Sequence, residues 1–200
     1  VYHSTNCFAH ECFIDELAHA AGKDPLNFRL EMLRGHRRYT AVLRKVAEMS
    51  DWFSKSAQSG KGFAIVERSG AFVAMVAEVI KENNRVKPVR FFAAIDAGIA
   101  VNPDIIRSQT EGCIIMGLQA AWYGLTVDEG RIIENNYHTY RMPAIGDCPE
   151  INVHVMENSE QPEGAGEAGL PPVAPALVNA IFALTQRRIR SLPLGPVIAV

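Results

Sequence analysis

The stretch Gly164-Ala165-Gly166-Glu167-Ala168-Gly169-Leu170-Pro171-Pro172 places one carboxylate inside a run of small residues. Glycine allows the backbone to approach a ligand closely, and proline suits the first turn of a helix, where an amide hydrogen has no partner. The apolar segment 172–185 that follows is expected to be this helix. Glu167 is then either a base held in an apolar pocket lined by Gly and Ala, or a first-turn acid that favours the helix dipole.

Helical periodicity dominates the N-terminal quarter of the chain. It predicts helices over about residues 7–22, 25–34 and 38–49, and Gly22 is a natural stop for the first of these. Asp24 followed by Pro25 has the pattern of an N-cap and a first helical position. The residues expected to face inward are Phe8, Cys12, Leu17 and Ala21 on the first helix, and Leu43, Val46 and Ala47 on the third.

The middle of the chain has the pattern of β-strands. We expect strands over residues 63–66, 71–80 and 86–95, with a hairpin turn at residues 82–85. Pro88 suggests an edge or a bulge in the third strand. A long helix over about 103–123, a turn at 128–131 and further short strands at 132–133, 151–156 and 189–194 complete the prediction.

This order of elements predicts an α+β fold with mixed or antiparallel sheets and packed helices. Residues 1–53 form a predicted helical segment, and residues 54–200 a predicted α+β unit. The composition is 48% hydrophobic and 21% charged, as in ordinary globular proteins. A net charge of −2 gives no electrostatic footprint for nucleic acid or an anionic membrane.

The ends and the cysteines give little information about location or metal binding. No apolar run approaches the roughly 20 residues of a membrane helix. Residues 1–6 do not resemble a signal peptide and contain no initiating Met, so we expect a piece of a longer polypeptide whose compartment is not predicted. Cys7, His10 and Cys12 lie close in sequence, but Cys12 would point away from the other two on a helix, which favours buried thiols over a metal site.

Two groups of polar residues could bind a ligand. Asp96, Gly98 and Asn102 lie where a strand hands over to the long helix, and they either cap that junction or present donors to a ligand. Gln109 shares one helical stripe with Gly112, Met116 and Ala120. Its amide is either a satisfied core group or a reader of a ligand edge, because it carries both donors and acceptors.

A third polar stretch follows the turn at residues 128–131. It contains His138 and Tyr140. The residues alone indicate packing on a surface hairpin, and the alternative, that these side chains lead toward a substrate, is implied only by a resemblance to related chains.

The run from 164 to 194, GAGEAGLPPVAPALVNAIFALTQRRIRSLPL, resembles the C-terminal signature of the molybdopterin-binding subunits of the xanthine dehydrogenase/aldehyde oxidoreductase family. The most similar branch is the isoquinoline 1-oxidoreductase beta-subunit type. Three further stretches match in the family's order: 13–18 through 22–25, 96–98 through 101–103, and 109–112 through 117–118. The ordered set is more specific than any one motif.

The resemblance implies roles for individual residues. In that family the Glu of the Gly-Glu motif is the active-site base beside molybdenum, and it falls on Glu167. The Gln of the Gln-x-Glu-Gly motif contacts the molybdopterin and falls on Gln109, and Gly112, Ala165 and Gly166 are the further cofactor-binding candidates. The metal is held by the pterin, so no side-chain metal ligand is expected.

The resemblance also implies an activity and partners. It implies oxidative hydroxylation of isoquinoline-like N-heterocycles or aldehydes with water, and a molybdopterin whose cytosine dinucleotide form is one candidate. Residues 54–200 would be the C-terminal part of the molybdopterin-binding domain. The rest of that subunit and a small [2Fe-2S] subunit would be the partners, since no iron–sulfur ligand set is evident in the chain.

Two departures limit what the chain would do alone. The family's upstream Gly-rich cofactor loops are absent, and residues 1–6 lack the Arg- and Gly-containing pattern on its substrate side. We therefore expect this chain to supply one wall of a site and to be inactive by itself. The alternative is a non-catalytic packing or subunit-interaction module in which Glu167 is only a cap.

Overall fold

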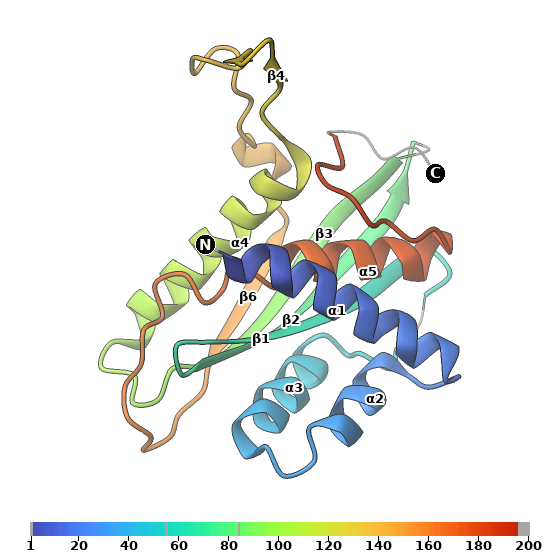
Figure 1. The fold of residues 1–200 in the computed structure, drawn as a ribbon. Helices are drawn as coiled ribbons and strands as arrows, with labels where there is room; N and C mark the ends of the chain where they lie inside the picture. The colour runs from blue at the N-terminus through green and yellow to red at the C-terminus, as the bar shows by residue number, and fades with distance from the viewer. Residues whose placement is uncertain (1, 55, 84, 196–200) are drawn as a thin grey trace.

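A four-stranded sheet with helices on both faces forms the body of the protein (Figure 1), as seen in a computed structural model that describes residues 2–54, 56–83 and 85–195. The strand order is β1-β2-β3-β6. The bounds are β1 Ser59–Arg68, β2 Ala71–Glu82, β3 Arg85–Asp96 and β6 Glu150–Val155. The first three strands pair in antiparallel fashion, and β6 pairs with β3 in parallel. The expected α+β class with mixed sheets is confirmed.

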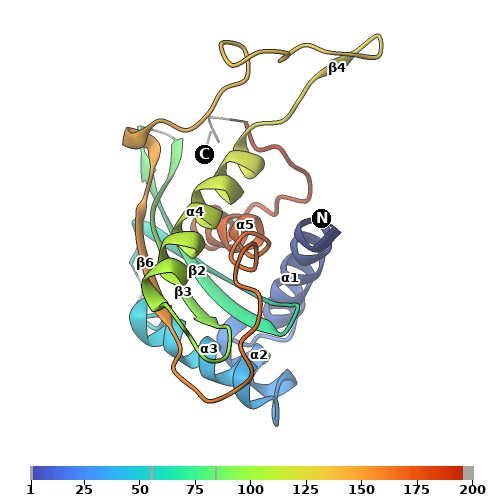
Figure 2. The ribbon, with the colours of Figure 1, turned by 90° about the vertical axis from the view of Figure 1, so that its left-hand side faces the viewer.

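Five α-helices surround this sheet in the described residues. Their bounds are α1 Tyr2–Ala20, α2 Pro25–Met32, α3 Arg37–Met49, α4 Pro103–Trp122 and α5 Val173–Thr185. α4 and α5 pack on one face of the sheet, and α2 and α3 on the other (Figure 2). No described helix combines the length and apolar character that a membrane span requires.

The two sheet faces carry alternate residues of the same strands. Ala64 and Met75 pack against α4 and α5, whereas their neighbours Ile65 and Ala74 pack against α3. Strand side chains point alternately to opposite faces, so a strand covered on both sides is apolar almost throughout. This is why the residues of β2 from Val73 to Val79 are all buried. The predicted inward residues of α3 are confirmed as buried.

The inward face predicted for α1 is wrong. Leu17 and Ala21 are exposed and Phe8 is half-buried, and Cys12 alone of the four predicted residues is buried. The buried residues of α1 are Cys7, Glu11, Cys12, Ile14, Asp15 and Ala18. Two carboxylates belong to this face because each has an arginine partner, which hydrophobic periodicity cannot reveal.

The outer edge of β1 is covered by side chains rather than by another strand. Glu11 accepts a hydrogen bond from Ile65 N–H at 3.0 Å, and the Asn179 amide donates to the Phe63 carbonyl at 3.0 Å. A Cβ added at Gly62 would collide with the backbone of α5, so this glycine allows α5 to lie directly on the strand. Covering an edge in this way removes the free donors and acceptors that invite unwanted strand pairing.

Three further expectations have clear outcomes. Asp24 caps α2 by accepting from Leu26 N–H and Asn27 N–H, as expected. The bulge predicted at Pro88 is confirmed by a register shift next to Val79, and that part of β3 lies beyond its pairing with β6. The predicted strand at 189–194 does not form. Instead the chain there closes the end of α4, where Leu194 N–H donates to the Ala121 carbonyl at 2.8 Å.

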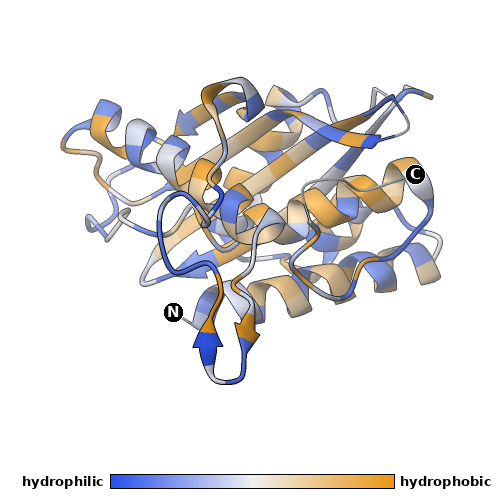
Figure 3. Cartoon of the chain, turned by 90° about the horizontal axis from the view of Figure 1, so that it is seen from above, coloured by the Kyte–Doolittle hydropathy of each residue, from blue (hydrophilic) through white to orange (hydrophobic). Residues whose placement is uncertain are grey.

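A hairpin of two-residue strands projects from the body (Figure 3), formed by β4 Val127–Asp128 and β5 Arg131–Ile132. It belongs to a longer excursion, residues 124–148, that links α4 to β6. The predicted boundary between residues 53 and 54 falls in the turn after α3. Since α3 shares a buried cluster with the sheet, the two sides of that boundary are in direct contact.

Candidate active site

Glu167 lies between β6 and α5 in a segment without helix or strand, residues 158–171, which we call the Glu167 segment. α5 begins only at Val173, with Pro172 as its N-cap, and has no acidic residue in its first turn. Glu167 is therefore too far upstream to act as a first-turn acid, because the helix dipole acts within the first turn. The structure removes this alternative for Glu167.

The first anchor of the segment is Asp96, at the end of β3. Its Oδ1 accepts from the Asn158 amide at 2.8 Å and from Gly98 N–H at 3.0 Å, and its carboxylate forms an ion pair with Arg38. Burial favours the neutral carboxyl, but Arg38 and the N–H donors outweigh it and lower the pKa of Asp96. Asp96 therefore holds the turn and the segment in place, which favours the structural reading of this junction.

Backbone hydrogen bonds continue the attachment next to Asp96. Ile99 N–H donates to the Glu160 carbonyl at 3.0 Å, and Glu163 N–H donates to the Ala97 carbonyl at 2.8 Å. Asn102 does not contact the Glu167 segment in these hydrogen bonds but caps a helix. Its side chain accepts from Asp104 N–H and caps α4.

The second anchor is α4, which holds the backbone immediately before Glu167. The amide nitrogen of Gln109 donates to the Gly166 carbonyl, and the Cys113 thiol donates to the same oxygen at 3.5 Å. Burial raises the pKa of the Cys113 thiol, which keeps its proton available for this contact. A Cβ at Gly169 would lie 3.1 Å from the side chains of Cys113 and Thr110, so the segment lies close against the helix.

The Glu167 side chain itself is 62% exposed and forms an ion pair with Arg68, the last residue of β1. The prediction of an apolar pocket around this carboxylate is therefore wrong for the described residues. The reason is that its small neighbours leave open space instead of walls. A Cβ added at Gly164 or Gly166 would meet nothing within 4 Å.

The predicted stripe on α4 is exposed along its whole length. Gln109, Gly112, Met116 and Ala120 all face outward, so the Gln109 amide is not a core group. A Cβ at Gly112 would also meet nothing within 4 Å. The Gln109 amide uses one donor on Gly166 and has a second donor and an acceptor for a ligand.

The five predicted site residues thus lie on two neighbouring elements. Gln109 and Gly166 are in direct contact, Glu167 follows Gly166, and Gly112 lies one helical turn from Gln109. Ala165 is half-buried and packs against the apolar cluster beneath the segment. The arrangement offers an open, small-residue surface with one carboxylate and one amide at its edge.

An apolar pocket of about 280 Å³ borders the far end of the stripe. Gly117 and Ala120 of α4 contribute to its wall, and so do Leu170 and Pro171, which end the Glu167 segment. The pocket is therefore continuous with the surface that carries Gln109 and Gly112.

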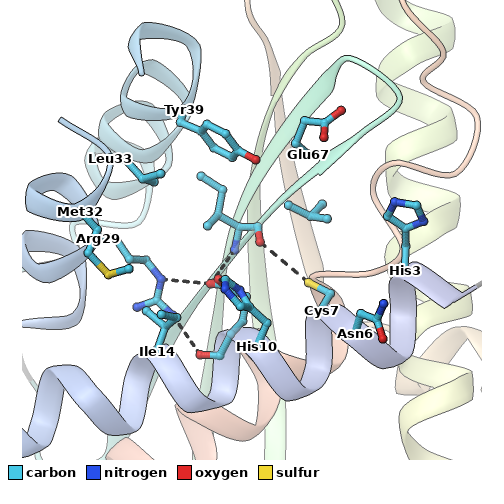
Figure 4. A pocket seen from close by; sticks show the side chains of 13 residues that line it. His3, Asn6, Cys7, His10, Ile14, Arg29, Met32, Leu33, Tyr39 and Glu67 are labelled. Atoms are coloured by element: carbon cyan, nitrogen blue, oxygen red, sulfur yellow. Dashed lines mark hydrogen bonds and ion pairs between the residues drawn. The ribbon is translucent and has the colours of Figure 1, made fainter. Parts of the chain in front are cut away.

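A second pocket, of about 310 Å³, lies along the outer edge of β1 (Figure 4). None of the predicted site residues lines it. Beside it Arg29 pairs with Glu11, and Cys7 is buried. Burial raises the pKa of Cys7 well above its usual value, so this thiol is not an activated nucleophile. In the described residues no group of three or more His, Cys, Asp or Glu is arranged to hold a metal ion.

Two of the predicted candidates lie outside this site, and two residues of the site were not predicted from the sequence. His138 and Tyr140 lie in the projecting excursion, not in the Glu167 segment. The sequence did not predict that Arg68 and Cys113 contact the Glu167 segment. Arg68 is 99 residues from Glu167, and no local pattern marks a contact of that separation. Cys113 lies one turn after Gln109, and its place on α4 was the available signal.

Comparisons with known proteins agree on a family. A model described as the molybdopterin cofactor-binding domain matches residues 7–149. Isoquinoline 1-oxidoreductase subunit beta of Brevundimonas diminuta is 38% identical over 199 residues, which cover 96% of this chain and 26% of that subunit. A membrane-bound aldehyde dehydrogenase of Gluconacetobacter polyoxogenes, whose name includes pyrroloquinoline quinone, is 32% identical over 209 residues, covering 93% of this chain and 27% of that protein.

A solved structure shares the fold at lower sequence identity. The aldehyde oxidoreductase from Desulfovibrio gigas superposes with a TM-score of 0.71 at 13% identity, covering 97% of this chain and 40% of the other. The chain spans about a quarter of the length of the two curated relatives. Since the family model matches well over half of its residues, the chain belongs to the molybdopterin cofactor-binding domain family.

Proposed function

We propose that this chain forms one wall of the active site of a molybdenum hydroxylase, with Glu167 as the general base. The reaction is the oxidative hydroxylation of a small electron-poor substrate with water as the oxygen source. The observation that carries the proposal is the attachment of Gly166 to Gln109, which holds the backbone next to Glu167 against the exposed stripe of α4.

The residues of this surface fit a molybdopterin. Gly112 and Gly166 leave space for a close approach, and the Gln109 amide can pair with the donor and acceptor edge of a pterin. Ala165 completes the set that would hold the group, and the cytosine dinucleotide form is one candidate. When bound, the cofactor supplies the redox chemistry, and the protein supplies position and charge.

Glu167 has two features that a base requires. Its side chain is 62% exposed in the described residues, so the carboxylate is accessible. Its backbone is fixed by the Gly166 contacts on one side and by the Leu170 N–H to Glu167 carbonyl hydrogen bond of 3.2 Å on the other. A carboxylate held in this way would take up the proton that is released when water attacks the substrate carbon.

The substrate class follows from the relatives. One is named for isoquinoline and another for aldehydes, which share an electron-poor carbon. We place isoquinoline-like N-heterocycles first, because that relative is the more similar, and aldehydes second. The partners would be the rest of the molybdopterin-binding subunit and a small [2Fe-2S] subunit that carries electrons away, and the chain alone would be inactive.

The test is Glu167→Gln in the complete enzyme. Loss of a general base costs about a hundredfold or more in turnover, so kcat should fall by at least that factor while molybdenum stays bound. Glu157→Gln is the matched control, since Glu157 is exposed and directly precedes the Glu167 segment. If E167Q keeps more than about a tenth of the activity, Glu167 is not the base.

The second candidate is a non-catalytic packing or subunit-interaction module. The projecting excursion favours it, because Tyr137 and Ile145 are 93% and 96% exposed there. Large exposed apolar side chains are typical of surfaces that another protein covers. A correctly matured full-length protein without molybdenum would support this candidate over the first.

A further inference from the structure

The ion pair between Arg68 and Glu167 joins the β1–β2 turn to the candidate base. The guanidinium contacts Oε1 of Glu167, and the two side chains are 26% and 62% exposed. The hydrogen bond from Arg68 reaches Oε1 and not Oε2 of this carboxylate. The pair therefore restrains the carboxylate without covering both of its oxygens.

Arg68 is itself held by the turn in which it lies. Its guanidinium also donates to the Ser69 hydroxyl. Ser69 and Gly70 both have positive φ, 52° and 81°, and Glu67 accepts from Gly70 N–H at 2.7 Å. A tight turn with these internal hydrogen bonds fixes the direction in which the Arg68 side chain leaves the strand.

The turn and the Glu167 segment meet at a second point. A Cβ added at Gly70 would lie 2.5 Å from the carboxyl carbon of Glu163, so Glu163 packs directly on the turn. Glycine suits this position for two reasons. It adopts the positive φ without strain, and it has no Cβ that would collide with Glu163. The β1–β2 turn thus contacts the segment four residues before Glu167 and again at Glu167.

We propose that Arg68 is a positioning residue for Glu167, so that the β1–β2 turn sets the direction of the base beside the α4 stripe. This inference rests on the proposed function, because it gives Arg68 a role only through Glu167. Gln109 and Cys113 fix the backbone of the base and Arg68 fixes its carboxylate. A misplacement of about 1 Å can cost on the order of a hundredfold in rate, so such a restraint has a measurable effect.

The kinetic test uses three variants of the complete holoenzyme. Arg68→Met should lower kcat by roughly 10- to 100-fold, with KM changed by less than about threefold and with molybdenum retained. Arg68→Lys should restore part of kcat. Arg107→Met is the matched control, since it removes an arginine that pairs with Asp104 at the start of α4, and it should leave kcat unchanged.

A second measurement does not depend on activity. In the cofactor-free full-length protein, backbone hydrogen exchange over residues 164–170 should become faster in R68M and stay unchanged in R107M. Equal exchange and equal kcat in R68M and the native protein would overturn the positioning role. Faster exchange with an unchanged kcat would also overturn it, because the contact would then only order the segment.

The outcome separates this inference from the proposed function. If E167Q abolishes turnover but R68M does not slow it, Glu167 remains the base and only the role of Arg68 is overturned. If E167Q retains its activity, the proposed function fails, and the catalytic role of Arg68 fails with it. If Glu167 and Arg68 act together, R68M adds little further loss to E167Q, since coupled residues are not additive.

Discussion

Two Glu–Arg pairs contact the same strand, β1, in different surroundings. Glu11 and Arg29 are each only 2% exposed, whereas Glu167 and Arg68 are 62% and 26% exposed. The Glu11 carboxylate accepts from Arg29 and from Ile65 N–H, both at 3.0 Å, and it lies 3.3 Å from a ring nitrogen of His10. The Glu167 carboxylate adjoins glycines that leave open space.

The difference in burial indicates that one Glu–Arg pair stabilises the fold and the other serves the candidate site. Glu11 is surrounded by donors and holds α1 and α2 on the edge of the sheet. Breaking a buried pair leaves an uncompensated charge, whereas an exposed pair contributes little to stability. The Glu167–Arg68 pair is therefore expected to matter for function and hardly for folding.

The largest expected effect on stability is that of Glu11→Gln. The substitution leaves Arg29 buried without a charged partner, so the free energy of unfolding should fall by about 3–5 kcal/mol. Chemical denaturation of the full-length protein measures it. Glu31→Gln, which breaks an exposed pair with Lys23, is the control and should cost less than about 1 kcal/mol. Similar costs for the two variants would contradict the comparison.

The pH dependence of stability should come from the same buried pair. Burial would raise the pKa of Glu11, but Arg29 and the hydrogen bonds lower it below 4.5, its ordinary value. A group whose folded pKa is lowered stabilises the protein above its unfolded pKa and loses this contribution as pH falls through the folded value. The unfolding free energy should therefore decline as pH falls below about 4.5, and the decline should be shallower in E11Q. Parallel curves for both proteins would show that Glu11 is not the group responsible.

The smallest expected effect on stability is that of Glu167→Gln. Its ion pair is largely exposed, so the free energy of unfolding should change by less than about 1 kcal/mol. Denaturation of E167Q beside E11Q in the same protein makes the comparison direct. A loss above about 2 kcal/mol would give Glu167 a structural role and would remove the contrast between the two pairs.

Local patterns predicted most of the elements of this fold. The N-cap at Asp24, the antiparallel pair of β2 and β3, and α3, α4 and α5 all depend on residues near one another in sequence, and they form close to where they were expected. The predicted inward face of α1 failed because Glu11 and Asp15 are buried by arginines at positions 29 and 188. Contacts of that separation have no periodic signature.

In the candidate site too, features set by neighbouring residues were predicted, whereas contacts between residues far apart in sequence were not. Gln109 and Gly112 could be placed on one stripe from helical spacing, and the small residues around Glu167 were visible directly. The Arg68 contact and the attachment of the segment to Asp96 could not be predicted, because they depend on how β1, β3 and α4 come together. The expected apolar pocket failed for a related reason, since glycines leave space whose filling depends on what lies opposite.

The central claim is that the stripe of α4 beside Glu167 is a cofactor surface, and molybdenum content tests it most directly. We would measure molybdenum by elemental mass spectrometry in the full-length native protein and in Gly112→Leu. Leucine fits the open space at this position and favours a helix over glycine by roughly 1 kcal/mol, so the variant should fold at least as well. The account predicts about one molybdenum per native chain and its loss in a folded G112L. Molybdenum retained in G112L, or absent from a matured native protein, would contradict it.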